Sequence, residues 1–221
     1  LAFASMILLP GFLTAKREAR VAWRHVKLCM LAGLFLSLHF LFWIESLKLT
    51  TVASSVVLVT TSPIFAAVLA WLFLRESISR RTALAILLCL AGSMTIGRGD
   101  ISFRPGMLRG DVYAVAGAAM FGAFFVTGRS VRNSLGHVQY AFLSYSSSSV
   151  ILILWATISH HTMFGFAAIN YLWLFLLGLG PQVFGHTSLV WALKYLPAPK
   201  VAISILGEPV GASLLAWVIF K

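Results

Sequence analysis

The fold of this chain is decided by residues 51–76, which read TVASSVVLVTTSPIFAAVLAWLFLRE. This stretch is long enough to cross a bilayer, since a spanning helix needs about 20 apolar residues. Pro63 lies near its middle, where a proline removes a backbone donor and interrupts the helix. The stretch therefore predicts a membrane-spanning helix that is broken near its centre.

The composition of the whole chain also indicates a membrane protein. Of its 221 residues, 60% are hydrophobic and 10% are charged, and the mean hydropathy is +0.93. Soluble domains carry about 25% charged residues, so this chain must face lipid. The net charge of +11 does not indicate nucleic-acid binding, because the basic residues stand in short clusters between apolar runs.

Apolar segments follow one another along the chain, and their continuous hydrophobicity predicts helices rather than the alternating strands of a barrel. They fall at 1–15, 28–47, 52–74, 82–97, 110–128, 138–158, 169–193 and 198–220. The loops on one side hold 12 of the 17 basic residues, so the positive-inside rule assigns that side to the cytoplasm. We expect an all-α, polytopic helix bundle and a multi-pass protein of the cell (inner or plasma) membrane.

The broken span has a second copy later in the sequence. Five spans separate the copies, so they run through the membrane in opposite directions, which is the plan of many secondary transporters. The identical positions are Leu47-Lys48, Pro63, Ala66 and Leu69-Ala70-Trp71, matched by Leu193-Lys194, Pro209, Ala212 and Leu215-Ala216-Trp217.

Two stretches give the chain a family resemblance. They are Ala53 through Pro63 to Leu74-Arg75-Glu76 with Ala91-Gly92, and Pro197 through Glu208-Pro209-Val210 to Trp217. These resemble the two repeats of EamA-type transporters in the drug/metabolite transporter superfamily. The resemblance implies two inverted five-helix repeats, of which about eight of ten helices are present. Residues 1–98 would form the first repeat, N-terminally incomplete, and residues 108–221 the second, C-terminally incomplete.

Polar residues inside the apolar spans are the candidate substrate-binding residues, because such residues are costly in lipid. Those expected to line a cavity are His39, Trp43, Ser62, Tyr145, Gln182, His186 and Glu208. His39 and Trp43 are four residues apart, as are Gln182 and His186, so each pair shares a helix face. Glu208 is either a substrate contact or proton carrier, or a protonated group that holds the helix kink.

Pro63, Pro181 and Pro209 are the expected helix kinks. A proline leaves a carbonyl without its usual partner, and in transporters such carbonyls face a cavity. The alternative for each proline is a kink that serves packing alone.

The sequence therefore predicts a secondary-active transporter, a permease that moves a small polar metabolite by alternating access. The resemblance implies an amino acid or a related compound as the substrate, with proton coupling if Glu208 carries the proton. No cofactor, metal or enzymatic activity is expected, since HExxH, GxSxG and Walker motifs are absent. The alternatives are a truncated paralogue that does not transport and an intramembrane enzyme acting on a lipid-linked substrate. The oligomeric state stays open.

Overall fold

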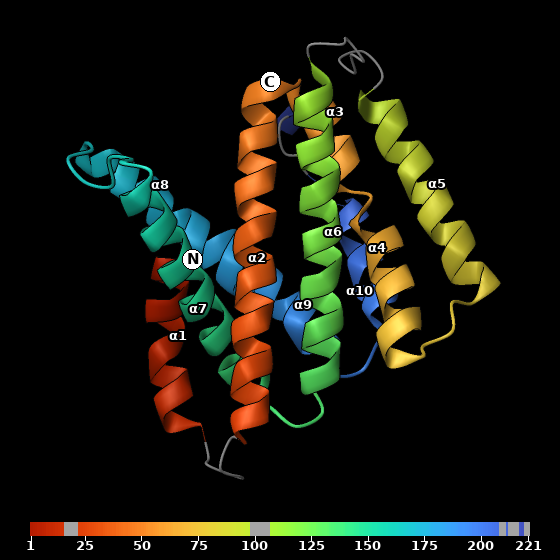
Figure 1. Cartoon of the computed structure of the whole chain (residues 1–221), viewed down its shortest axis with the longest axis horizontal. Helices are drawn as coiled ribbons and strands as arrows, with labels where there is room; N and C mark the ends of the chain where they lie inside the picture. The colour runs from red at the N-terminus through yellow and green to blue at the C-terminus, as the bar shows by residue number, and fades with distance from the viewer. Residues whose placement is uncertain (16–21, 98–106, 208–210, 212–216, 219–221) are drawn as a thin grey trace. The chain divides into compact units, whose positions relative to one another are not determined.

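A computed structural model describes all of the chain except residues 16–21, 98–106, 208–210, 212–216 and 219–221 (Figure 1). The regular elements in these described ranges are all helical, which confirms the predicted fold class. The α-helices are α1 (Ala2–Thr14), α2 (Trp23–Leu49), α3 (Val52–Val59), α4 (Ser62–Leu69), α5 (Arg80–Gly97), α6 (Leu108–Val131), α7 (His137–Ile158), α8 (Ala168–Leu177), α9 (Thr187–Ala192) and α10 (Ala198–Ile203).

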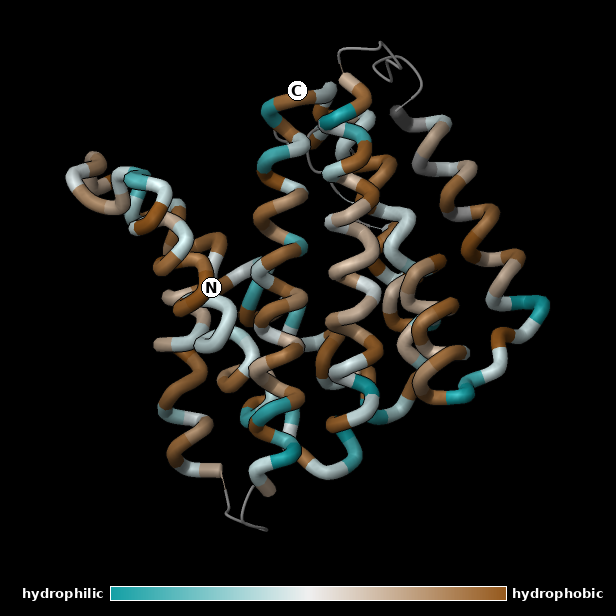
Figure 2. The backbone as a smooth tube through the Cα atoms, in the orientation of Figure 1, coloured by the Kyte–Doolittle hydropathy of each residue, from teal (hydrophilic) through white to brown (hydrophobic). Residues whose placement is uncertain are grey.

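Within the part of the chain that the structure describes, five helical segments are long and apolar enough to cross a membrane. They are Trp23–Leu49, Val52–Leu74, Leu108–Val131, His137–Ile158 and Ala168–Ala192. Figure 2 shows hydrophobic colour along most helical turns, with hydrophilic colour mainly at helix ends and in loops. The helices match the predicted apolar segments, although α2 begins at Trp23 rather than at 28 and much of the last segment, 198–220, lies outside the described residues. Helical geometry does not stop where the apolar run stops, so the helix continues into the basic segment before it.

The chain divides into two compact units. Unit 1 comprises Leu1–Ser37 and Thr127–Tyr195, and unit 2 comprises Leu38–Val126 and Leu196–Lys221. In unit 1, α1 packs along α7, and α7 also contacts α9. Tyr140 and Tyr145 of α7 are completely buried in this unit, so the helix presents its aromatic residues to its neighbours.

Unit 2 is built around contacts of α10 with α4 and α5. A small apolar cluster of Ala67, Ile86, Leu90 and Leu206 joins α4 and α5 to the residues that follow α10. Gly122 of α6 lies against α4, where an added Cβ would come within 2.7 Å of the backbone nitrogen of Ala66. The close approach of these helices therefore depends on the missing side chain.

The span Val52–Leu74 is broken between α3 and α4. Thr51 caps the start of α3 by accepting a hydrogen bond from the Ser54 backbone nitrogen at 3.0 Å. Pro63 is at the first turn of α4, a position that tolerates its missing N–H. The span ends in a short π-helical segment, η1 (Ala70–Leu74), and Arg75 follows it in the left-handed conformation.

A second irregular span is Ala168–Ala192. Between α8 and α9 it forms a nine-residue π-helical segment, η3 (Gly178–His186), which contains Pro181. The π-helix is rare, and where it occurs within a helix it is frequently found at a functional site. Near the end of the chain, α10 passes into a short 3₁₀ helix, η4 (Ser204–Gly207).

Candidate functional site

The first cluster of candidate residues lies in unit 2 on α2 and α6. His39 is 3% exposed and its ring stacks on Phe121, with centroids 4.2 Å apart and planes 12° apart. The Trp43 ring also stacks on the His39 ring, with centroids 5.7 Å apart and planes 21° apart. The sequence spacing of four residues therefore places the imidazole and the indole in contact.

A hydrogen bond determines which nitrogen of the His39 ring carries the hydrogen. Its Nδ1 lies 3.0 Å from the carbonyl oxygen of Gly117. A carbonyl only accepts, so Nδ1 carries the hydrogen and donates it. The indole Nε1 of Trp43 is buried and has no hydrogen-bond partner. This cluster thus contains one satisfied donor and one unsatisfied donor.

Ser62 also belongs to unit 2 and sits at the α3–α4 break. Its side chain is completely buried, and its Oγ has no hydrogen-bond partner. The neighbouring hydroxyls are used locally: Thr60 donates to the Val57 carbonyl at 2.8 Å and Thr61 to the Leu58 carbonyl at 2.6 Å. The Ser62 hydroxyl, unlike those of Thr60 and Thr61, is therefore available to hydrogen-bond a ligand.

The second cluster of candidate residues lies in unit 1, where α7 meets the irregular span. The Tyr145 hydroxyl is 3.4 Å from Thr187 Oγ1, and the side chain of Gln182 also interacts with it. Thr187 Oγ1 donates to the backbone carbonyl of Gln182 at 3.3 Å. Gln182 is 6% exposed, and its Nε2 has no hydrogen-bond partner. His186 is half-buried at the end of η3.

Glu208 and Pro209 lie outside the described residues. Their roles in substrate binding and in the helix kink therefore remain predictions. Pro63 stands at the start of α4 and Pro181 within η3. In the described part of the chain, no group of three or more His, Cys, Asp or Glu side chains could hold a metal ion.

Two arginines at the end of α6 form contacts that the sequence did not reveal. Arg132 is 2% exposed; it donates from Nε to the Val190 carbonyl at 2.9 Å and from Nη1 to the Leu135 carbonyl. Arg129 donates from Nη1 to the carbonyls of Leu193 and Lys194, at 2.9 and 3.1 Å. Burial lowers the pKa of the Arg132 guanidinium below its usual value. The arginines satisfy carbonyls at the end of α9 that its own helix leaves free.

In the sequence these arginines counted only as loop charges. The available signal was their position in the last turn of a helix, next to a second helix end in unit 1. That position does not predict which carbonyl groups the two side chains bind.

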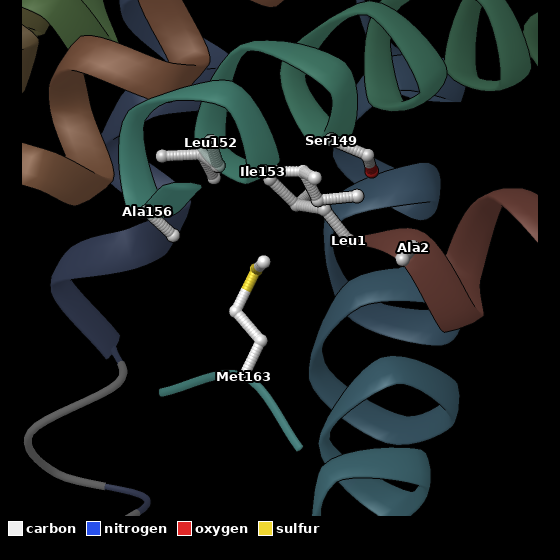
Figure 3. A pocket seen from close by; sticks show the side chains of 7 residues that line it. All are labelled: Leu1, Ala2, Ser149, Leu152, Ile153, Ala156 and Met163. Atoms are coloured by element: carbon white, nitrogen blue, oxygen red, sulfur yellow. The ribbon is translucent and has the colours of Figure 1, made fainter. Parts of the chain in front are cut away.

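An apolar pocket of about 220 Å³ also lies in unit 1. Figure 3 shows that methyl and thioether groups face it, with Met163 reaching in from the loop after α7. Its lining residues are Leu1, Ala2, Ser149, Leu152, Ile153, Ala156 and Met163. The Ser149 hydroxyl donates to the Tyr145 carbonyl at 2.7 Å, so the pocket offers little to a polar ligand. It contains none of the predicted substrate-binding residues.

Comparison with known proteins identifies the family. The EamA-like transporter family matches residues 1–98 and 108–221. A solved structure described as "Crystal structure of protein" is similar in fold, with a TM-score of 0.77 and 18% identity over 98% of this chain and 75% of that one. No curated protein matches the chain. The chain is thus an integral membrane protein that belongs to the EamA-like transporter family, within the drug/metabolite transporter superfamily.

Proposed function

We propose that this chain is a secondary-active permease of the cell membrane that moves a small polar metabolite by alternating access. The observation that carries the proposal is a set of buried polar atoms without partners, inside long apolar helices. They are Trp43 Nε1, Ser62 Oγ and Gln182 Nε2. Leaving such an atom unsatisfied costs about 1–3 kcal/mol. A polar ligand that enters the protein would supply the missing partners.

The interrupted helices support the same proposal. Irregular backbone at membrane depth is tolerated where it is buried in protein or lines a water-filled cavity. The α3–α4 break carries Ser62, and η3 carries Gln182. In transporters, broken helices bear the substrate site while the repeats move around it.

In this mechanism the two repeats, residues 1–98 and 108–221, rock against each other around the bound metabolite. His39, Trp43, Ser62, Tyr145, Gln182, His186 and Glu208 contact the substrate along its path. Pro63, Pro181 and Pro209 provide the bends. Glu208 carries a proton and so couples transport to the pH gradient. An amino acid or a related compound is the substrate class.

Uptake into proteoliposomes tests this function. We expect saturable uptake of at least one member of a panel of radiolabelled amino acids and related metabolites, faster with a pH gradient than without one. Trp43→Phe, which removes the unpaired indole N–H, should slow uptake. Trp173→Phe is the matched control, because Trp173 lies on α8 and is 58% exposed.

Glu208→Gln should remove the pH dependence while leaving the protein folded. Absence of saturable uptake of every panel member, with folded protein in the vesicles, would contradict the proposed function.

A further inference from the structure

The amide nitrogen of Gln182 is the most informative unsatisfied atom in unit 1. It is buried and has no hydrogen-bond partner, and the residue is 6% exposed. An amide nitrogen donates two hydrogens and accepts none. A ligand that completes this position must therefore present an acceptor atom.

Among the described residues, the helices around Gln182 offer no acidic side chain to accept those hydrogens. The helices packed against η3 are α1, α8 and α9, and α7 adjoins through α9. None of these helices contains an aspartate or a glutamate. An ammonium group placed here would meet no carboxylate, whereas a carboxylate would meet the amide donor.

The Tyr145 hydroxyl adds a second donor to the same place. Thr187 uses its hydrogen on the Gln182 carbonyl, so the hydrogen between Tyr145 and Thr187 comes from Tyr145. Their oxygen–oxygen distance of 3.4 Å is long for a bond between hydroxyls. The tyrosine can therefore turn its hydrogen to a better acceptor at little cost.

We propose that Gln182 and Tyr145 bind a carboxylate of the transported metabolite. This inference rests on the proposed function and names the chemical group that this cluster of unit 1 recognises.

Sets of three related probes test the inference on the full chain. Leucine carries both charged groups, 4-methylpentanoate keeps only the carboxylate, and isoamylamine keeps only the ammonium group; phenylalanine, 3-phenylpropionate and phenethylamine form a second set. Binding is measured as thermal stabilisation of the purified protein in detergent, because a ligand that binds only the folded state raises its stability. We expect the carboxylate probes to stabilise the protein and the amines not to.

Substitutions then test whether the carboxylate probes bind at Gln182 and Tyr145. Gln182→Leu should weaken carboxylate binding by about tenfold or more, since hydrogen bonds to charged groups are the strong ones. Gln182→Glu should reverse the preference toward the amines. Asn170→Asp is the matched control, because Asn170 lies on the same span and is exposed; it should leave the preference unchanged. Tyr145→Phe keeps the buried ring and serves if a Gln182 variant does not fold.

The results separate this inference from the proposed function. Stabilisation by carboxylates without flux in proteoliposomes would remove the transport function and keep the binding site. Equal or greater stabilisation by the amines, no stabilisation by any carboxylate, or carboxylate binding that survives both Gln182→Leu and Tyr145→Phe would overturn the inference.

Discussion

The contact between α2 and α7 in unit 1 gives the sharpest stability prediction, through Gly33→Ala. A Cβ added at Gly33 would lie 2.6 Å from the backbone oxygen of Ser144 and 2.7 Å from Ser147 Cβ. Real Cβ atoms essentially never approach below 3.0 Å, so the helices must separate by at least about 0.4 Å. The backbone oxygen cannot rotate away, and separation would also stretch the 3.0 Å hydrogen bond between Ser37 and Ser148.

Such overpacking costs about 1–3 kcal/mol. Gly92→Ala is the matched control, since Gly92 also lies within a helix but an added Cβ would meet nothing within 4 Å. Both variants gain the same helix propensity of about 1 kcal/mol, so the difference between them isolates the clash.

Thermal unfolding in detergent, followed by tryptophan fluorescence, measures that difference. At about 2–4 °C per kcal/mol, Gly33→Ala should melt roughly 2–12 °C below Gly92→Ala. Equal melting temperatures, or a higher one for Gly33→Ala, would refute the packing argument.

Three other substitutions test separate contacts by chemical unfolding. Arg132→Met should lower the free energy of unfolding by about 3 kcal/mol, because buried carbonyls lose a charge-assisted donor. The loss should exceed that of Arg129→Met, because the Arg129 side chain is half-exposed. A larger loss for Arg129→Met would contradict the argument from the burial of Arg132. His39→Phe keeps a ring to stack but loses the bond to a carbonyl, so we expect a loss of about 1 kcal/mol; a more stable variant would show that the bond contributes nothing. Asp111→Ala removes the acceptor 2.8 Å from the Thr50 hydroxyl and an acid in the first turn of α6; a loss of about 1–2 kcal/mol is expected, and an unchanged midpoint would contradict this.

The helices could be predicted from the sequence because their signal is local. A long apolar run can satisfy its backbone in lipid only as a helix, so each predicted span contains a helix in the described ranges. The break before Pro63 is local too, since proline has no N–H to continue the ladder. Likewise, the four-residue spacing of His39 and Trp43 was enough to predict that their rings share a face.

The rest depends on contacts between segments distant in the chain. Pro181 indicated an irregularity in Ala168–Ala192, but not that it would take the form of the π-helical segment η3. The bonds of Arg132 to carbonyls were also unpredictable, because they form only when α6 and α9 meet. Gln182 was selected as a polar residue in an apolar span. That its amide nitrogen is buried without a partner follows from three-dimensional packing, to which the sequence pattern gives no access.

The central claim is that the chain carries its substrate by alternating access, and counterflow in proteoliposomes tests it most directly. Vesicles are loaded with an excess of unlabelled substrate, identified in the uptake screen, and diluted into a trace of the labelled compound. A carrier that exposes one site alternately to each side predicts transient accumulation of label above its equilibrium level, lost or slowed in Gln182→Leu and retained in Asn170→Asp. Label that only equilibrates, at a rate independent of the internal substrate, would contradict alternating access.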